Sequence, residues 1–594
     1  MSDATTNQKP SLWQELQYLG RLWPFLREDQ WVLWVSLLCS PIISGLSLLQ
    51  PYFIKEIIDK HLSVGMYDGV ETLSFWYLGS VIVAYVCSVG YSLGLSWAGM
   101  RMLVRLREWL FQRIISLPLS FFDSRPAGML LTRLTNDIDA LGEVIGAGIV
   151  TIALDILMVI GCVGLMLWIN WELTILLLIF APILIWMIEA VRRKLQDLYL
   201  IIRDSISAVN TFLAEQIDGV EVLQIFRAEE RSQQNFDLRN LKFRDASMES
   251  NIYDALMFAM VDGMSSVFVA LLLWYGTGQL GQLLGVSWLS ISPISAGVMV
   301  AFIDYLQRLL TPIRDISQKI SVIQRAFASL SKIFSLVDEC EPVDTKGIAL
   351  SNVQGHIVIK NLHFAYQKDD VLRGLNVEIQ PGQVVAIVGS SGSGKTTLSR
   401  LLDRSYEGYR GSILLDGVEL SACALPDLRK NVVSVRQDIQ IFSRSVEFNI
   451  TLDNPNISHD IAQEAVELTC ADRMVADIGW DKVLRERGSD LSVGQGQLLT
   501  FARMMAVNAP VVILDEATAS VDSVTEQQIQ QAIENIFSKK TVIVIAHRLS
   551  TIQKADKIIV LEKGVIIEEG THASLLAKGG RYAHLVEAGK SVVG

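Results

Sequence analysis

Residues Gly389 to Thr397 have the types and spacing needed to bind the phosphates of a nucleotide. They read Gly-Ser-Ser-Gly-Ser-Gly-Lys-Thr-Thr and follow the apolar, β-branched run Val384–Val388. Helix-forming residues come next, so the order is strand, glycine-rich turn and helix, the context expected of a phosphate-binding loop. The glycines allow a tight turn in which successive N–H groups face phosphate oxygens, and the helix adds the positive end of its dipole.

Two side chains of this loop add specific chemistry. Lys395 places a positive charge between the β and γ phosphates, and the Thr396 hydroxyl is a ligand for Mg²⁺. The other interpretation is a glycine-rich turn that contains a lysine by chance. The predicted nucleotide contacts of the loop are Gly389, Ser390, Ser391, Gly392, Ser393, Gly394, Lys395, Thr396 and Thr397.

Polar residues follow three further apolar runs that are predicted to be strands. The run 511–514 ends at Asp515, which can hold Mg²⁺ directly or through water, and Glu516, which can orient and deprotonate an attacking water. Gln437 follows the run 432–435 and could reach Mg²⁺ or that water. His547 follows the run 541–546 and could donate to the γ phosphate. A glutamine or histidine at a strand end is ordinarily a loop or surface residue, but the order of these strands is that of a parallel sheet.

Other residues suggest contacts with the base and with a second anion. Tyr366 lies between predicted strands 356–366 and 371–379, where its ring could stack on adenine. Leu491-Ser492-Val493-Gly494-Gln495 precedes a predicted helix, so Ser492, Gly494 and Gln495 could form an anion site at its start. One ATP does not need two γ-phosphate sites, so this second site suggests a nucleotide held by another subunit.

The composition indicates a membrane protein. Of 594 residues, 51% are hydrophobic and 19% are charged, and the mean hydropathy is +0.36, with the apolar excess before about residue 310. This is too apolar for an ordinary soluble protein.

The formal net charge of −12 argues against a nucleic-acid partner. The six cysteines follow no metal or disulfide spacing, so we expect them to be reduced.

Long uncharged runs predict six membrane-spanning helices, because a hydrocarbon core of about 30 Å needs about 20 apolar residues. The predicted spans are Trp31–Ile54, Thr72–Met100, 156–171, 173–188, 255–276 and 294–311. The third and fourth are joined by the short turn Asn170-Trp171-Glu172. Residues 11–27 predict an amphipathic helix at the membrane interface, and the polar first ten residues lack the pattern of a cleaved signal.

Basic residues set the expected orientation. Arginine and lysine are concentrated between the second and third spans and between the fourth and fifth. We therefore expect these segments and both termini to be cytoplasmic, and the helices to continue beyond the bilayer. The predicted organisation is an N-terminal interfacial segment (1–30), a transmembrane domain (31–325), a linker (326–350) and a nucleotide-binding domain (351–594).

Three carboxylates lie within or near the apolar spans. They are Asp155, Asp262 and Asp304. A carboxylate in a membrane is costly unless it faces a partner or a water-filled cavity, where it would favour cationic substrates. Alternatively, each lies in a cytoplasmic extension of its helix, where water reaches it.

The motifs taken together resemble a known family. The order of Tyr366, the 389–397 loop, Gln437, the 491–495 signature, Asp515-Glu516 and His547 is similar to the nucleotide-binding domain of ABC transporters. The first half resembles the six-helix domain of ABC exporters. Phe121-Phe122-Asp123…Gly128 and Asp218-Gly219…Val222…Phe226 resemble the regions around that family's two coupling helices. The implied fold is an α-helical polytopic membrane domain followed by an α/β P-loop ATPase domain.

The resemblance implies a dimer that holds two ATP molecules, with Mg²⁺, between the phosphate loop of one subunit and the signature of the other. Asp522, in Ser520-Val521-Asp522, is included in the implied nucleotide site. The second coupling helix would contact the partner's ATPase domain. The implied activity is ATP-driven export of small hydrophobic or cationic compounds, of the multidrug type, across a bacterial inner membrane.

The signature departs from the family pattern. The family has Leu-Ser-Gly-Gly-Gln, and here Val493 replaces the first glycine, which predicts that the site completed by this signature hydrolyses ATP poorly. This combination resembles the SmdB/MdlB type of bacterial heterodimeric multidrug exporter. It predicts a non-identical partner with an intact signature and a Walker B motif that lacks the catalytic glutamate. The alternatives are a homodimer, a lipid or peptide flippase, and an ATP-gated channel or regulator.

Overall fold

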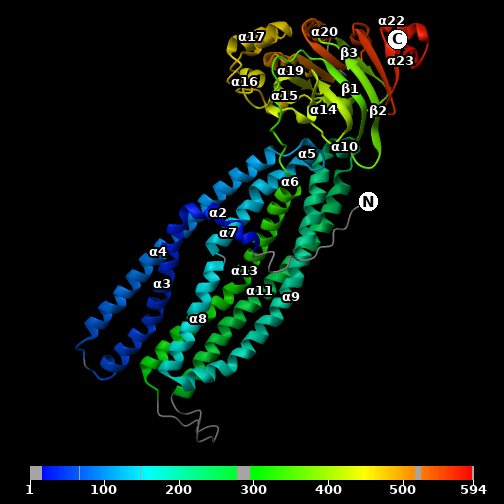
Figure 1. Ribbon diagram of the computed structural model, residues 1–594. Helices are drawn as coiled ribbons and strands as arrows, with labels where there is room; N and C mark the ends of the chain where they lie inside the picture. The colour runs from blue at the N-terminus through cyan, green and yellow to red at the C-terminus, as the bar shows by residue number, and fades with distance from the viewer. Residues whose placement is uncertain are drawn as a thin grey trace. The chain divides into compact units, whose positions relative to one another are not determined.

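The computed structural model describes residues 17–65, 67–147, 149–276, 294–515, 523–546 and 548–590. The chain divides into two compact units (Figure 1). The helical unit comprises Met1–Ile115 and Ala127–Glu339. The α/β unit comprises Ser116–Pro126 and Cys340–Gly594, so a short segment from the first half of the sequence belongs to the second unit.

The helical unit is built mainly from long helices. Its elements are α2 (Trp23–Leu26), α3 (Gln30–Ile57), α4 (Val70–Ile115), α6 (Ala127–Thr132), α7 (Ile138–Ala147), α8 (Ile149–Ile169), α9 (Trp171–Asp218), α10 (Val220–Ile225), α11 (Glu229–Gly276) and α13 (Ala296–Glu339). Short 3₁₀ or π segments lie at Arg27–Asp29, Ile58–Leu62 and Arg133–Asp137. Helices α4, α9 and α11 have 46 to 48 residues, more than a bilayer requires.

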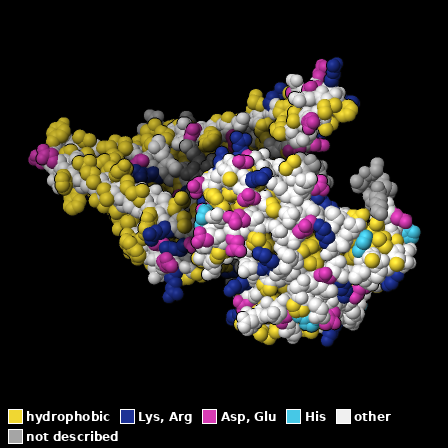
Figure 2. Space-filling view, turned by 90° about the horizontal axis from the view of Figure 1, so that it is seen from above, with side chains coloured by type: hydrophobic (Ala, Val, Ile, Leu, Met, Phe, Trp, Pro, Cys, Tyr) yellow, Lys and Arg dark blue, Asp and Glu magenta, His cyan; other side chains and the backbone are white. Residues whose placement is uncertain are grey.

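Within the described residues, four helices are long and apolar enough to cross a membrane. They are Gln17–Leu62, Val70–Ile115, Trp171–Asp218 and Glu229–Tyr275. They contain the first, second, fourth and fifth predicted spans. The third predicted span corresponds to a shorter apolar segment, Leu154–Ile169, and the sixth lies at the start of α13. Four spans are therefore supported, and the other two stay a prediction. Hydrophobic side chains cover much of this unit's surface (Figure 2).

Helices α8, α9, α11 and α13 pack together near the turn at Asn170. This turn is shorter than predicted, because α9 already begins at Trp171, and the Asn170 side chain caps it by accepting from the Leu173 N–H at 3.0 Å. A buried apolar cluster from all four helices lies at this end. Its largest members include Met166, Leu173, Phe268, Leu272, Phe302 and Tyr305.

The predicted linker is mostly helical. Helix α13 continues to Glu339, so residues 326–339 belong to it, and the irregular part is limited to residues 340–356. Helix α11 ends at Gly276, and residues 277–293, between the fifth and sixth predicted spans, lie outside the described residues.

The α/β unit contains two sheets. Its strands are β1 (Ile357–Ala365), β2 (Asp370–Ile379), β3 (Val384–Val388), β4 (Arg410–Leu415), β5 (Val418–Glu419), β6 (Val432–Val435), β7 (Val511–Asp515), β8 (Thr541–Ile545), β9 (Lys557–Glu562) and β10 (Val565–Gly570). The four-stranded antiparallel sheet has the order β2-β1-β4-β5. The six-stranded sheet has the order β10-β9-β3-β8-β7-β6, and all its neighbours are parallel except β10 with β9.

The helices of the α/β unit surround these sheets. They are α5 (Leu119–Asp123), α14 (Lys395–Leu402), α15 (Leu425–Asn431), α16 (Val446–Thr451), α17 (His459–Leu468), α18 (Asp472–Ile478), α19 (Val493–Val507), α20 (Ser523–Phe537), α21 (Leu549–Gln553), α22 (His572–Lys578) and α23 (Arg581–Lys590). Within residues 445–490, the helical parts are α16, α17, α18 and one 3₁₀ turn at Glu486–Gly488.

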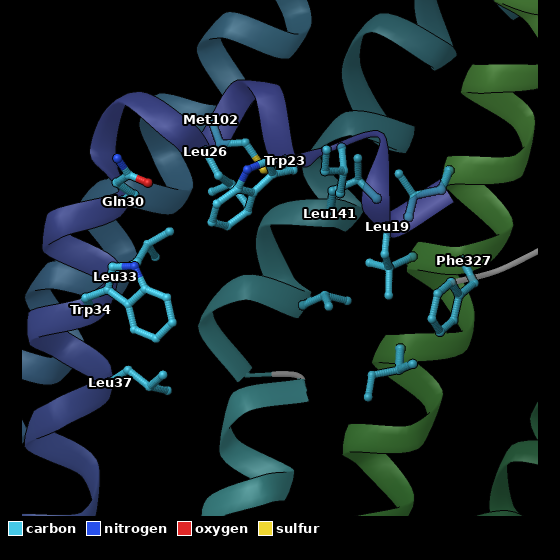
Figure 3. A pocket seen from close by; sticks show the side chains of 15 residues that line it. Leu19, Trp23, Leu26, Gln30, Leu33, Trp34, Leu37, Met102, Leu141 and Phe327 are labelled. Carbon is cyan, nitrogen blue, oxygen red and sulfur yellow. The ribbon is translucent and has the colours of Figure 1, made fainter. Parts of the chain in front are cut away.

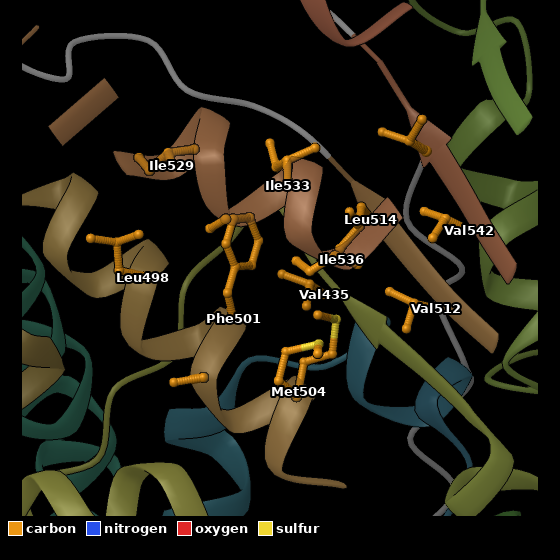
Figure 4. Close-up of a cluster of buried hydrophobic side chains, with 14 of the residues drawn as sticks. Val435, Leu498, Phe501, Met504, Val512, Leu514, Ile529, Ile533, Ile536 and Val542 are labelled. Atoms are coloured by element: carbon orange, nitrogen blue, oxygen red, sulfur yellow. The ribbon is translucent and has the colours of Figure 1, made fainter. Parts of the chain in front are cut away.

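The central strands of the six-stranded sheet are buried on both faces. In β3, Val384, Ala386 and Val388 face one core, and Val385 and Ile387 face the other, as the two-residue period of a strand requires. The first core lies between the sheet and helices α19 and α20, where Phe501 and Ile533 are buried (Figure 4). The second core includes α14, α15 and the antiparallel sheet. Burial on both faces explains why β3, β7 and β8 are continuous apolar runs.

Candidate functional site

Several predicted site residues lie at one edge of the six-stranded sheet. Strands β3, β8, β7 and β6 are parallel neighbours, so their carboxyl ends share that edge. β3 leads into Gly389, β7 ends at Asp515, and Gln437 lies in an exposed bend after β6. Glu516, Asp522 and His547 lie outside the described residues, so their roles stay predictions. Ligands of open α/β sheets bind at this edge.

The 389–397 loop has a backbone that only glycine fits at two positions. A Cβ on Gly389 would lie 2.1 Å from the Leu561 carbonyl oxygen. Gly394 has φ +105°, and a Cβ there would lie 2.6 Å from the Leu372 side chain. Helix α14 starts at Lys395, directly after Gly394. The loop therefore approaches its neighbours closely and leads into a helix start, as phosphate binding requires.

Lys395 is a buried cation held by the loop itself. Its side chain is 7% exposed, and its Nζ donates to the carbonyl oxygens of Gly389 at 2.8 Å and Ser390 at 2.9 Å. Burial lowers the pKa of the Lys395 amine, and the nearby charge of Asp515 opposes this shift. A bound phosphate would add negative charge beside this buried ammonium group.

The residues at this edge fit a nucleotide-bound Mg²⁺. Within the described residues, no three histidine, cysteine, aspartate or glutamate side chains gather into a metal site. Mg²⁺ bound with a nucleotide needs few protein ligands, because phosphate oxygens and water complete its octahedron. The Asp515 carboxylate and the exposed Thr396 hydroxyl are oxygen donors of the required kind.

Tyr366 lies beside the phosphate loop and belongs to an aromatic cluster. Its hydroxyl donates to Thr397 Oγ1 at 3.1 Å, and its ring is 44% exposed. The Tyr406 ring packs edge-on against it, with centroids 5.0 Å apart. The Tyr406 hydroxyl in turn donates to Asp123 on α5, and Asp123 also accepts from Arg400 on α14 at 3.0 Å. Phosphate loop, aromatic cluster and α5 are thus connected within the α/β unit.

The signature forms the capped start of α19. Ser492 is the N-cap, and its hydroxyl accepts from the Gln495 N–H at 3.2 Å, while Gln495 Oε1 accepts from the Ser492 N–H at 2.9 Å. This capping box leaves the first N–H groups of the helix directed outward. Gly494 is buried, and Val493 is 56% exposed. Because the cap is intact, Val493 changes the surface at the helix start and leaves the local fold in place.

A cavity of about 1080 Å³ lies within the helical unit. Side chains of four helices line it, among them Asp155 and Ile160 of α8, Glu189 and Tyr199 of α9, Asp254 and Phe258 of α11, and Ile320 and Arg325 of α13. The apolar cluster at 162–177, 261–275 and 298–310 continues the same four helices toward Asn170. These helices therefore close the cavity at the end near Asn170.

The three carboxylates singled out in the spans have different surroundings. Asp155 lines the cavity and forms a salt bridge with Lys319. Asp304 pairs with Arg308 at 3.3 Å on the same helix. Neither Asp304 nor Asp262 belongs to the described lining of the cavity. Of the two alternatives left open for Asp155, the structure supports the cavity position. Its charge, however, is neutralised by a partner that the sequence did not reveal.

A second, apolar pocket of about 350 Å³ lies beneath the N-terminal segment (Figure 3). Trp23 and Leu26 of this segment, Trp34 and Leu37 of α3, and Phe327 of α13 line it. Gln30 is the polar residue of the lining. The segment thus buries apolar side chains against the long helices, as an amphipathic interfacial helix would.

Comparison with known proteins agrees with this geometry. The family model of the ABC transporter transmembrane region matches residues 33–310, and that of the ABC transporter matches residues 372–519. The chain belongs to the ABC transporter family. It is an exporter half with fused transmembrane and ATP-binding domains, and ABC exporters work as dimers. Its second domain is an ATPase that couples ATP hydrolysis to transport.

Full-length relatives extend this similarity. The chain is 33% identical over 588 residues to an uncharacterized ABC transporter ATP-binding protein, YknV, of Bacillus subtilis, covering 98% of this chain and 95% of the relative. It is 32% identical over 593 residues to an ATP-dependent lipid A-core flippase of Chromobacterium violaceum, covering 98% of each. A bacterial Atm1-family ABC exporter with ATP bound shares the fold, with a TM-score of 0.72 and 23% identity over 94% of this chain and 98% of that chain.

Sequence reasoning missed several residues around these sites. Arg400 and Tyr406 belong to no motif, and their contact with Asp123 spans more than 270 residues of sequence. Asp254 lines the cavity one residue before the predicted fifth span, and its partner Tyr199 lies on another helix. A carboxylate at the border of an apolar run was the available signal for Asp254.

Proposed function

We propose that this transporter is one half of a heterodimeric exporter that moves small hydrophobic or cationic compounds outward across a bacterial inner membrane. The large cavity of the helical unit carries this proposal. It combines apolar side chains with a few ionisable ones, the lining expected of a site for amphipathic small molecules. Both termini and the α/β unit would be cytoplasmic, as the distribution of basic residues predicts.

The proposed ATP site uses the sheet edge described above. The backbone of residues 389–397 and Lys395 would hold the phosphates, and the Tyr366 ring would stack on adenine. Thr396, Asp515 and Gln437 would hold Mg²⁺, which supplies charge neutralisation at the transferred phosphoryl group. Glu516 would deprotonate the attacking water.

The remaining nucleotide contacts would lie close to the γ phosphate or come from the second subunit. His547 would donate to the γ phosphate, and Ser492, Gly494, Gln495 and Asp522 would contribute to nucleotide contacts between the two subunits. The first N–H groups of α19 support this role, because the helix start carries a partial positive charge.

Transport would follow an alternating-access cycle. ATP bound between the two ATPase domains would favour their closure, because the γ phosphate contacts both subunits only in the closed state. Hydrolysis would remove that contact and reset the cavity. The exposed apolar residues of α10, Val222 and Ile225, support a contact with a second chain.

Val493 supports a non-identical partner. Its side chain is exposed at the start of α19 and contributes nothing to the core, so folding does not require it. A side chain there would keep the helix start away from a phosphate and weaken the site that this signature completes. The partner would then supply the intact signature, and its own Walker B motif would lack the catalytic carboxylate. A homodimer with two weakened sites is the alternative.

A second candidate function is lipid translocation. Relatives named ATP-dependent lipid A-core flippase align over nearly the whole chain. In this case the substrate would enter from the bilayer, and a lipid would replace the soluble compound in the cavity. A channel or regulator is less well supported, because Glu516 is present in the sequence.

Two measurements test the proposal. An affinity-tagged chain purified from its native membrane should bring down a second ABC chain in equal amount; an active dimer of this chain alone would contradict the heterodimer. The ATPase activity of the purified complex should then rise with hydrophobic or cationic compounds. Stimulation by lipid A-type lipids alone would favour the flippase and overturn export of small compounds.

A further inference from the structure

The charges around the 1080 Å³ cavity are almost all paired. Asp155 forms a salt bridge with Lys319, and Glu189 pairs with Arg192 at 2.7 Å. Arg325, also in the lining, pairs with Glu143 at 2.9 Å. Each of these cavity charges has an opposite charge within salt-bridge distance, so none of them is left to recognise a charged ligand without first losing its partner.

Asp254 is different. It lines the same cavity from α11, and its carboxylate accepts hydrogen bonds from the Tyr199 hydroxyl at 3.1 and 3.3 Å. A phenol is neutral, and among the described residues no lysine, arginine or histidine lies within salt-bridge distance of Asp254. This carboxylate therefore lies at the wall of a largely apolar cavity with no described cationic side chain beside it, an arrangement that favours a cationic ligand.

Aromatic and apolar groups surround the carboxylate. The Tyr199 ring and Phe258, one helical turn from Asp254, belong to the same lining, together with Met257. Aromatic faces attract cations, and thioether and aromatic side chains adapt to apolar ligands of varied shape. The combination matches a hydrophobic cation better than a neutral molecule or an anion.

We infer that Asp254, oriented by Tyr199, is the point in this cavity that recognises the positive charge of a hydrophobic monovalent cation. The inference rests on the proposed export of small compounds and narrows its substrate class. The Asp155 carboxylate plays no such part, because Lys319 already neutralises it.

A purely structural role is the competing explanation. The Tyr199–Asp254 contact joins α9 to α11, as the pair Lys194–Glu249 also does at 3.4 Å. The substitution Asp254→Asn separates the two roles, because an amide oxygen still accepts from Tyr199 while the charge is lost. Glu249→Gln is the matched control, since it removes a carboxylate from the same helix at a position that is not part of the described cavity lining.

The test measures binding to the assembled exporter in lipid nanodiscs without nucleotide. The probes are tetraphenylphosphonium, a hydrophobic cation, and triphenylphosphine oxide, a neutral relative. We expect Asp254→Asn to weaken binding of the cation by about tenfold or more and to leave binding of the neutral probe unchanged, as the loss of one close charge pair predicts. Asp254→Glu should restore most of the cation affinity, and Glu249→Gln should bind both probes as the unmodified exporter does.

Three results would overturn the inference. Unchanged cation binding in Asp254→Asn would remove Asp254 from recognition, and equal weakening of both probes would reveal a structural role. Equal binding of the cation and the neutral probe by the unmodified exporter would also overturn the inference. If neutral compounds then stimulated its ATPase, the proposed export of small compounds would still stand. If the exporter bound no small compound, and no small compound stimulated its ATPase, the proposed function itself would fail.

Discussion

The Asp123 carboxylate connects α5 to the rest of the α/β unit, and this contact leads to a quantitative prediction. Asp123 accepts from the Tyr406 hydroxyl and from Arg400. Phe121 of the same helix is buried, at 2% exposed. Burial raises the pKa of Tyr406 to about 12, and the hydrogen bond to Asp123 contributes to the shift. The phenol is therefore protonated at neutral pH and can donate.

Tyr406→Phe removes this donor, together with a long 3.5 Å hydrogen bond that the Tyr406 hydroxyl accepts from Arg400. The Arg400–Asp123 pair and the ring packing stay in place. A hydrogen bond to a charged group contributes about 1.5–3 kcal/mol. The Asp123 side chain is 40% exposed, so water partly replaces the lost donor and the lower value applies. A change of about 1.4 kcal/mol is about tenfold in an equilibrium constant. We therefore expect local opening of α5 to become about tenfold more frequent.

Hydrogen exchange of the backbone amides in residues 119–123 measures this opening directly. Tyr406→Phe should lower their protection about tenfold. Tyr409→Phe is the matched control, because the Tyr409 hydroxyl donates to Glu419 at 2.6 Å and, among the described residues, not to Asp123. If both variants changed the protection of α5 equally, or if neither did, the argument from the Asp123–Tyr406 contact would be refuted.

The raised pKa of Tyr406 also sets the pH range of this contact. A tyrosine whose pKa rises on folding stabilises the folded state fully below its unfolded pKa of about 10. That contribution is lost as the pH rises toward about 12. Protection of α5, corrected for the intrinsic exchange rate, should therefore be constant between about pH 7 and 9.

Three more predictions concern the ATP site. Glu516→Gln should retain ATP binding and lose most of the turnover of the purified complex, and unchanged turnover would contradict its role as the base. Because burial lowers the pKa of the Lys395 amine, ATP affinity measured by calorimetry should weaken as the pH rises from about 7 toward 10, and a flat profile would be inconsistent with a charged lysine at the phosphates. Ser492→Ala should lower the free energy of unfolding by about 1 kcal/mol through loss of a helix cap, and it should also lower ATPase activity. The control Ser458→Ala, which removes the cap of α17, should lower stability alone. Equal ATPase activity in the two variants would argue against a nucleotide contact by the signature.

Local elements of the ATPase domain were predictable because their signals are local. The run Val384–Val388 was expected as a strand and is β3. The run ending at Asp515 is β7. Such strands are apolar on both faces and bounded by turn residues, so neighbouring residues suffice to define them. Segment 445–490 was less predictable, because its short helices are separated by turns whose positions depend on packing.

The sequence alone also determined the phosphate loop, the apolar spans and the family, since each depends on residue types at fixed spacing along the chain. The tertiary structure decided which charges are neutralised. Asp155 was expected to be important and is paired with Lys319, 164 residues away, whereas Asp254 was not singled out and faces the cavity beside a phenol. The physical reason is that a carboxylate's environment depends on the helices packed against it, and helical periodicity specifies a face of each helix without specifying its neighbour.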